Sequence, residues 1–227
     1  MTGAYRKLYE KLKGYDLIVF DMDGTLYFQK SLQIRMACRL IKHAAFHIRG
    51  FKELRAVLNY RKIREKWDVG KSMDEDGIFK EVSVKTGLKE KDIKDVIDRW
   101  MFKEPLRAVK ASKDKRLADV INALLSDGKN VCIYSDYPAA DKAAVLDVDK
   151  RVRIFSAGSD GIETLKPDPS GLLKVISKYP GTGRDRVIMV GDRKDRDGRA
   201  AEGAGVRYVI LKRFMISRLM ADLRVMN

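Results

Sequence analysis

The feature that most constrains the fold of this chain is the alternation of short apolar runs with longer amphipathic segments. The apolar runs predict buried strands at 16–20, 131–135, 152–155, 187–190 and 207–211. The amphipathic segments predict helices at 112–126, 139–147, 170–178 and 196–203. Strands that alternate with helices form parallel sheets through right-handed crossovers. The sequence therefore predicts an α/β protein whose parallel sheet has helices on both faces.

The long segment between the first two predicted strands has a different, all-helical pattern. Residues 31–66 carry apolar side chains at helical spacing, with a break expected near Gly50. The stretch "DVGKSMDEDG", residues 68–77, is expected to be a loop. Residues 74–103 divide into two helices near Gly87.

Pro105 marks the end of this helical segment, because a proline disfavours helix in the residue before it. We therefore expect two domains, an α/β core of residues 1–29 and 106–227 and an inserted helical domain of residues 30–105. Two further helices are expected in the core, at 3–13 and from about residue 214.

The net charge of +15 is concentrated in the helical segment. Residues 30–71 hold 12 Lys or Arg against 3 Asp or Glu, and "NYRKIREKW", residues 59–67, interleaves cations with aromatic side chains. A basic face can attract anionic substrates, nucleic acid or membrane phosphates. It can also be an ordinary solvated helix surface. We expect the segment mainly to face anionic substrate or solvent, and do not favour a nucleic acid or anionic surface as partner.

The apolar runs, the N-terminus and the cysteines bear on the expected location of the protein. The longest apolar runs are strand-sized, so no transmembrane segment is expected. The N-terminus has no apolar signal region, so we expect a cytoplasmic protein. Cys38 and Cys132 are interpreted as reduced packing residues, since two cysteines alone make a weak disulfide or metal pattern. The oligomeric state is left open.

Two aspartates stand directly after the first predicted strand, in "DMDGTL". Asp21 and Asp23 point to the same side of an extended chain, and their like charges repel unless a cation or a shared proton relieves them. Gly24 permits backbone conformations that a Cβ would block, and Thr25 adds a hydroxyl.

Two common loops do not account for these motifs. An EF-hand needs glycine and glutamate at loop positions where this chain has Leu26 and Leu32. A P-loop needs a Gly-Lys-Ser/Thr ending, which "PGTGRDR" at 180–186 lacks, so that segment is interpreted as a glycine-rich turn.

Further polar residues follow the other strands of the predicted sheet. Ser135 and Asp136 end the second strand, and Lys166 lies in "LKPDP" ahead of a predicted helix. The fourth strand leads into "VGDRKDRDG", which carries three acids: Asp192, Asp195 and Asp197. Ligands of parallel α/β sheets bind at the carboxyl ends of the strands. These residues are therefore expected to share one site.

The order of these motifs resembles the haloacid dehalogenase-like hydrolase superfamily. The resemblance covers residues 14–29 and 106–212 and is strong at "DMDGTL", "LKPDP" and "GDRKDRD". Residues 30–105 are similar to the helical cap of that superfamily in position, size and helicity. The resemblance implies a Rossmann-like core with an inserted cap domain and, because an acid stands at Asp23, a phosphomonoester hydrolase acting on a small phosphorylated metabolite.

Three residues would carry the catalysis that this resemblance implies. Asp21 is placed to attack phosphorus and form an aspartyl-phosphate. Asp23 would protonate the leaving oxygen and later activate water, so it must first be protonated, which its like-charged neighbours favour. Lys166 would neutralise charge on the phosphoryl group.

The same resemblance implies a Mg²⁺ cofactor and a phosphate-binding set. The metal would be held by Asp21, Asp192 and the backbone carbonyl of Asp23, with its waters oriented by Asp197 and, as a further candidate, by Asp195. Substrate contacts are expected from Thr25, Ser135 and Asp136. Asp136 stands where the family often has asparagine, so it would either place an acid near the phosphate or cap the following helix.

Two other functions stay open at this point. A phosphomutase of the same family would use the same aspartyl-phosphate and return the phosphoryl group to a sugar. A binding protein would keep the core as a scaffold and grip nucleic acid or an anionic membrane through the basic segment. His43 and His47, four residues apart, are interpreted as part of a polar helix face, because no third metal ligand is evident.

Overall fold

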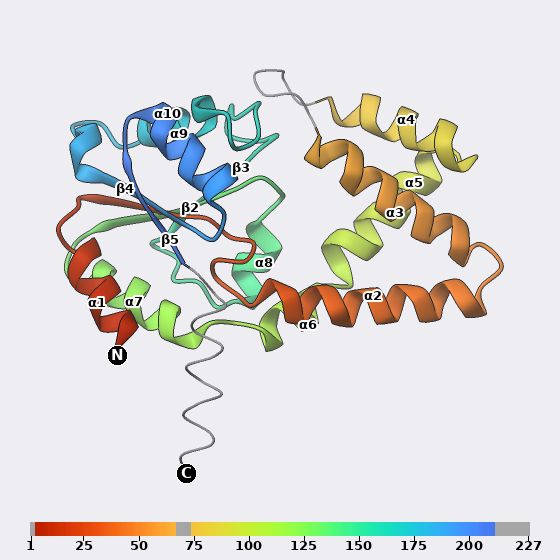
Figure 1. Cartoon of the computed structure of the whole chain (residues 1–227), viewed down its shortest axis with the longest axis horizontal. Helices are drawn as coiled ribbons and strands as arrows, with labels where there is room; N and C mark the ends of the chain where they lie inside the picture. The colour runs from red at the N-terminus through yellow and green to blue at the C-terminus, as the bar shows by residue number, and fades with distance from the viewer. Residues whose placement is uncertain (1–2, 67–73, 212–227) are drawn as a thin grey trace, which may run out of the picture.

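The computed structural model describes residues 3–66 and 74–211, and its centre is a parallel sheet of five strands (Figure 1). The strands are β1 (Leu17–Phe20), β2 (Asn130–Ser135), β3 (Arg153–Ser156), β4 (Val187–Gly191) and β5 (Arg207–Ile210). They lie in the order β3-β2-β1-β4-β5, so β1 is central and pairs with both β2 and β4. The predicted α/β fold is confirmed, and the carboxyl ends of these three strands are neighbours.

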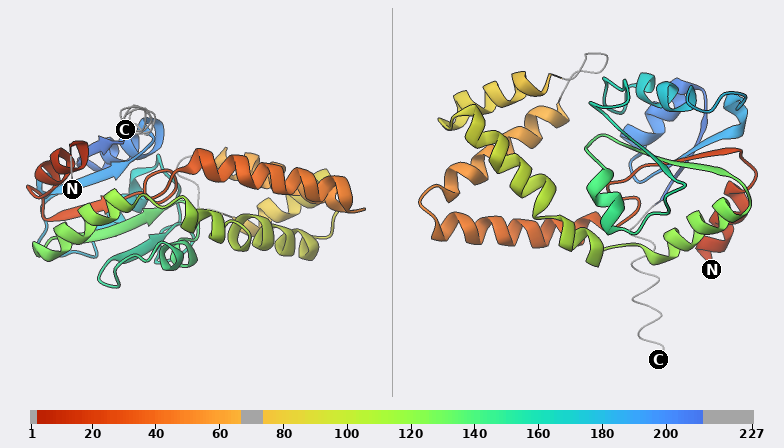
Figure 2. Two further views of the ribbon diagram at one scale, coloured as in Figure 1. Left: turned by 90° about the horizontal axis from the view of Figure 1, so that it is seen from below. Right: turned by 180° about the vertical axis from the view of Figure 1, so that it is seen from behind.

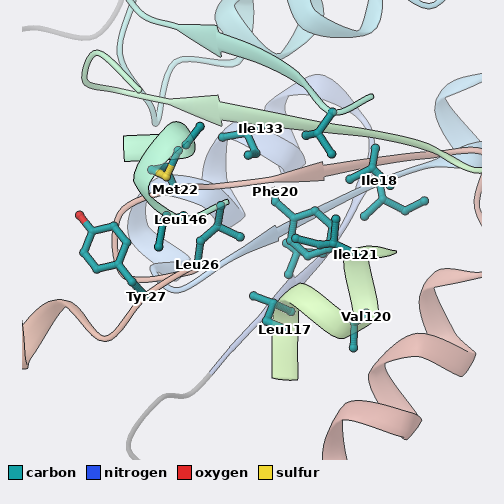
Figure 3. Packing of buried hydrophobic residues seen from close by; sticks show 14 of the residues in the cluster. Ile18, Phe20, Met22, Leu26, Tyr27, Leu117, Val120, Ile121, Ile133 and Leu146 are labelled. Atoms are coloured by element: carbon teal, nitrogen blue, oxygen red, sulfur yellow. The ribbon is translucent and has the colours of Figure 1, made fainter. Parts of the chain in front are cut away.

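Helices cover both faces of this sheet, as predicted. Ile18 and Phe20 of β1 pack into one hydrophobic cluster, whereas Leu17 and Val19 pack into another on the opposite face. The first cluster includes residues of α1 (Ala4–Leu12) and α7 (Lys115–Ser126) and is shown in Figure 3; the second includes residues of α9 (Pro169–Ile176) and α10 (Arg199–Ala204). Because both faces are buried at the centre of the sheet, β1 and β4 carry no polar side chain.

Several helices of the core differ from the prediction at their ends. The helix expected at 112–126 begins at Lys115, since Asp114 caps it by accepting the N–H groups of Arg116 and Leu117 at 3.2 Å. Along the chain, the short helix α6 (Leu106–Ala111) precedes α7, and the short helix α8 (Ala140–Val145) follows β2. We did not predict α6 as a separate helix.

The fourth strand lies between two short helical turns. The 3₁₀ turn η2 (Arg184–Arg186) precedes it, within the segment predicted to be a glycine-rich turn. After β4 the predicted helix at 196–203 is divided into a π-helical turn, η3 (Lys194–Gly198), and α10. The helix predicted from about residue 214 lies outside the described residues.

A group of helices is inserted between β1 and β2 and extends away from the sheet (Figures 1 and 2). It comprises α2 (Gln29–Phe46), α3 (Gly50–Glu65), α4 (Glu75–Thr86), α5 (Glu90–Ile97) and the π-helical turn η1 (Asp98–Lys103). We call residues 29–103 the helical insertion. It has a hydrophobic cluster of its own, which includes Tyr60, Ile78 and Trp100.

The predicted breaks within the helical insertion are confirmed. A Cβ at Gly50 would lie 2.6 Å from the Cα of Ala44, so glycine lets the turn between α2 and α3 close tightly. Gly87 ends α4 at φ +68°, which suits glycine. Of the loop predicted at 68–77, residues up to 73 lie outside the described part, and α4 begins right after its cap, Asp74.

Other predictions concern single residues and membrane segments. Cys38 and Cys132 are both free thiols, but only Cys132 is buried as a packing residue; Cys38 is exposed, so that prediction is wrong for it. His43 is bonded to Glu53 at 3.0 Å and stacks on His47, and within the described residues no metal-binding group includes either histidine. None of the helices in residues 3–66 and 74–211 is long and apolar enough to cross a membrane.

Candidate active site

The site is built on the ends of two adjacent strands. The N–H of Asp21 donates to the carbonyl of Val190 at 2.8 Å, so the β1–β4 pairing continues to the first aspartate. The chain then turns at Gly24, where φ is +94°. A Cβ on Gly24 would lie 2.2 Å from the carboxylate of Asp192, which follows β4. Only glycine therefore lets the two acidic segments approach so closely.

Lys166 is buried between two of the predicted acids. Its ammonium nitrogen lies 2.5 Å from Asp21 Oδ1 and 2.9 Å from Asp197 Oδ1. Burial raises the pKa of Asp21 well above its usual value, and Lys166 offsets only part of that effect. Burial also disfavours the ammonium, but Asp197 and Asp21 outweigh it and keep the pKa of Lys166 well above normal. Lys166 is therefore a permanent cation beside Asp21.

Three carboxylates form a group that could hold a metal ion. Asp21, Asp192 and Asp197 each offer an oxygen, and these atoms lie within 4.8 Å of one another. Burial, together with the charge of Asp197, raises the pKa of Asp192 to about 6. Carboxylate oxygens are the ligands that Mg²⁺ prefers, and a divalent cation would relieve their mutual repulsion. The residues present therefore fit a magnesium ion.

Asp195 does not join this group. It is exposed, and Arg193 Nη2 lies 2.7 Å from its carboxylate. Asp197 instead is buried, and its Oδ2 accepts the N–H groups of Asp192 and Arg193 at 3.2 and 3.0 Å. Asp197 thereby fixes the loop that carries Asp192.

Asp23 has partners that the sequence analysis missed. Lys142 Nζ lies 2.6 Å from Asp23 Oδ1, and the hydroxyl of Tyr27 donates to the same carboxylate. Burial alone would raise the pKa of Asp23, but Lys142 and Tyr27 outweigh it and hold that pKa below its usual value. The expectation that neighbouring acids keep Asp23 protonated is therefore wrong for the free protein.

A sequence signal for Lys142 did exist. Ala139, Lys142, Ala143 and Leu146 follow helical spacing along α8, and all four are buried. A lysine on the apolar side of a helix loses its hydration when it is buried, so it needs an acid as partner.

Two of the residues expected at the substrate contact other protein groups. The hydroxyl of Thr25 donates to Asp21 Oδ2 at 2.9 Å, so Thr25 orients Asp21. Ser135 is fully buried at the end of β2, and its Oγ accepts the N–H of Tyr137 at 3.1 Å. Among the described residues, no acceptor takes the Ser135 hydroxyl proton.

Asp136 links the loops of the core. Its Oδ1 accepts the backbone N–H of Lys166 at 2.9 Å, and its Oδ2 lies 3.4 Å from Arg196. The helix α8 that follows has Ala139 at its N-cap and no side-chain cap, so the alternative that Asp136 caps this helix is wrong. Its acid is instead neutralised by Arg196, which the sequence analysis also missed.

Two arginines connect these loops to the helical insertion. Arg64 at the end of α3 is buried, donates to the carbonyl of Asp136 at 2.8 Å, and stacks over Tyr137. Arg196 donates to the carbonyls of Lys166 and Glu65 at 3.1 and 3.0 Å. The insertion is therefore bonded to the loops that position Lys166.

A cavity of about 460 Å³ opens between the core and the helical insertion. At one end it is lined by the acidic group and by Lys166 and Lys142. Most of the rest of its wall comes from α2, α3 and η1. Asp21 and Asp23 thus face a space large enough for a small organic molecule.

Comparison with known proteins agrees with this geometry. The family model for haloacid dehalogenase-like hydrolases matches residues 15–205, which is most of the chain. The chain belongs to this hydrolase family. Comparison with curated proteins found no match.

Solved structures support the same fold. A protein from Bacillus subtilis, named as the HAD-hydrolase YfnB bound to magnesium, is 14% identical with a TM-score of 0.62, covering 87% of this chain and 88% of its own. A 2-haloacid dehalogenase from Pseudomonas syringae is 16% identical with a TM-score of 0.58, covering 86% of each. A protein named as a β-phosphoglucomutase from Thermotoga maritima is 18% identical with a TM-score of 0.56, covering 85% and 83%. These relatives differ in chemistry, so they define the fold alone.

Proposed function

We propose that this chain is a Mg²⁺-dependent phosphatase that hydrolyses a small phosphorylated metabolite through an aspartyl-phosphate on Asp21. The proposal rests on the contacts that Asp21 makes. Its two carboxylate oxygens are held by Lys166 and Thr25, and a second carboxylate, Asp23, faces the same cavity. A fixed nucleophile with an independent acid–base residue is what phosphomonoester hydrolysis requires.

The first step would transfer the phosphoryl group to the protein. A carboxylate oxygen of Asp21 attacks phosphorus, the ester P–O bond breaks, and Asp23 gives a proton to the departing oxygen. In the free protein Lys142 keeps Asp23 ionised. An anionic phosphate entering the cavity would compete for Lys142, which would raise the pKa of Asp23 and let it carry that proton.

The second step would release phosphate. Asp23, now a carboxylate, accepts a proton from water, the water oxygen attacks phosphorus, and the bond to Asp21 breaks. Lys166 neutralises charge on the phosphoryl oxygens in both steps, and Ser135 would donate its hydroxyl proton to one of them.

The proposed metal site consists of Asp21, Asp192 and the backbone carbonyl of Asp23, with Asp197 as the group that orients the ligands. Bound there, Mg²⁺ would supply Lewis-acid polarisation of a phosphoryl oxygen.

We further propose that residues 30–105 act as a cap over this site. The support is that the helical insertion supplies most of the cavity wall and is bonded to the core through Arg64 and Arg196. An aspartyl-phosphate needs controlled access of water, which such a cap would provide.

The other candidate functions have less support. A phosphomutase would share the chemistry of Asp21, but much of the cavity wall is apolar and does not favour a sugar that must bind in two orientations. A dehalogenase needs no acid at Asp23. A binding protein is disfavoured because it would need neither a Lys166 buried between Asp21 and Asp197 nor the pairing of Asp23 with Lys142.

The experiment is hydrolysis of a generic aryl phosphate, with Mg²⁺ and with chelator, by the native protein and by Asp21→Asn. We expect phosphate release that requires both the metal and Asp21. Asp195→Asn is the matched control, because Asp195 is an exposed acid outside the metal group. Equal activity of native protein and Asp21→Asn would overturn the proposal. Isomeric monophosphates formed from a sugar bisphosphate without phosphate release would favour the mutase.

A further inference from the structure

The charged and amide side chains of the cavity wall lie near the aspartates, with Leu32 among them, and the wall is mostly apolar away from them. Along α2, Gln29 and Gln33 lie at the end next to the core, whereas Ala37 and Ile41 lie further along the same helical face. These side chains span twelve residues, which is about 18 Å of helix. The cavity therefore extends well beyond the space that a phosphate needs.

The helix α3 on the opposite wall also has its polar side chains near the core, although it runs toward the core and α2 runs away from it. The carboxyl end of α3 meets the core, where Arg196 binds the carbonyl of Glu65. Glu65 and Arg61 line the cavity there, while Leu58 and Leu54 line it further out. Because two helices of opposite direction show the same order, the polarity of the cavity follows distance from the aspartates.

Within residues 3–66 and 74–211, the apolar end of the cavity is left open. Ile41 and Leu58 line the cavity, yet they are 59% and 55% exposed. Trp100, Met101 and Phe102 of η1 add aromatic and thioether surface to the same wall. Exposed apolar side chains that converge on a cavity are stabilised when a ligand covers them.

We propose that the substrate is the phosphomonoester of an apolar alcohol, with a long alkyl, isoprenoid or polycyclic aryl group. This inference rests on the proposed phosphatase function. The phosphate would lie among Asp21, Lys166 and Lys142, and the apolar group would extend along Met36, Leu40 and Ile41. A sugar or other polyol in that position would leave its hydroxyls facing apolar side chains without hydrogen bonds.

Such an ester can come from solution or from a membrane. Both sources are tested because the tip of the α2–α3 hairpin could contact a membrane. There Phe46, Ile48 and Phe51 are exposed beside the cations Arg49 and Lys52. The shared chemistry, a phosphate on an apolar chain, is the same in either case.

The test measures phosphate release from ethyl, butyl, hexyl and octyl phosphate at monomeric concentrations, with glucose 6-phosphate as the polyol comparison. We expect kcat/KM to rise at least tenfold from butyl to octyl phosphate, because each buried methylene favours binding. Hexadecyl phosphate in phosphatidylcholine vesicles forms a second arm. Turnover there above that of octyl phosphate assigns the membrane source, and lower turnover assigns the soluble one.

Matched variants locate the apolar group in the cavity. Ile41→Gln and Leu58→Gln should each lower the octyl-to-ethyl ratio of kcat/KM about three- to tenfold. Ile34→Gln is the control, because Ile34 is 66% exposed on the same helix α2 but is not part of the cavity wall. All three replaced side chains are exposed, so unchanged melting temperatures should show that the variants fold.

The outcomes separate the two proposals. If no phosphate ester is hydrolysed, the proposed function itself fails. If esters are hydrolysed but kcat/KM is flat with chain length, or highest for glucose 6-phosphate, the phosphatase stands and the apolar substrate is overturned. An equal effect of Ile34→Gln and Ile41→Gln on the ratio would also overturn it.

Discussion

The carboxyl edge of the sheet and the helical insertion differ in the side chains that they present to the cavity. At the sheet, buried charges such as Asp21, Lys166 and Asp197 are paired with one another at short distances. In the insertion, apolar side chains such as Ile41 and Leu58 stay exposed. A buried charge must have its partner before substrate arrives, whereas an exposed apolar surface can receive its partner from the ligand. Under the proposed function, the core would carry out the chemistry and the insertion would select the substrate.

The largest effect on stability is expected from Lys166→Met, which tests the pairing in the core. It would leave Asp21 and Asp197 buried without their cation, lowering the free energy of unfolding by about 3–5 kcal/mol in chelator at pH 8. Turnover should fall on the order of 10²–10³-fold because phosphoryl charge loses one donor. Denaturant unfolding and phosphate release measure both effects.

Lys178→Met is the control for this variant, because Lys178 is an exposed lysine of the same domain. Added Mg²⁺ should restore part of the lost stability by replacing the missing cation. If Lys166→Met and Lys178→Met unfold alike in chelator, the buried charges do not depend on each other.

A smaller effect is expected from Arg64→Met, which tests the connection between the two regions. The buried guanidinium of Arg64 donates to the Asp136 carbonyl at 2.8 Å and the Tyr60 hydroxyl at 3.2 Å. Its loss should cost about 2 kcal/mol of unfolding free energy and speed limited proteolysis between core and insertion. Lys62→Met, an exposed change on the same helix, is the control, and identical cleavage rates would contradict the connection.

The smallest effect concerns pH and the metal-free site. Asp192 has a pKa raised to about 6, and that of Asp21 is raised as well, so the folded state favours their protonated forms. Stability in chelator should therefore fall as pH rises from about 4.5 to 7. The contribution of Asp192 is about 1 kcal/mol, reduced by its partial exposure.

Asp192→Asn should flatten this decline, and Mg²⁺ should remove it by favouring the ionised carboxylates. Asp195→Asn is the control, because Arg193 lowers the pKa of Asp195 and it does not titrate in this window. Melting temperatures across pH measure the slopes, and a stability that rises with pH in chelator would refute the assignment. Because the pKa of Asp23 is lowered, its protonation changes the stability only below this pH range.

The core was largely predictable because its signals are local. Each strand is a short apolar run, and the rule that parallel strands gather ligands at their carboxyl ends brought Asp21, Asp192 and Lys166 into one site. Helix ends were less predictable, as with the helix that starts at Lys115, since capping by Asp114 competes with the apolar pattern. The split of 194–204 into a π-helical turn and α10 was not visible in the sequence either.

The sequence by itself determined the succession of strands and helices along the chain, and the breaks at Gly50 and Gly87. It also determined which acids follow β1 and β4. These features depend on neighbours along the chain. The tertiary structure alone decided that Lys142 neutralises Asp23 and that Arg196 joins three loops. It also decided that α2 and α3 enclose a graded cavity. Those contacts join residues far apart in the sequence, and no local preference specifies which of many charged side chains will meet.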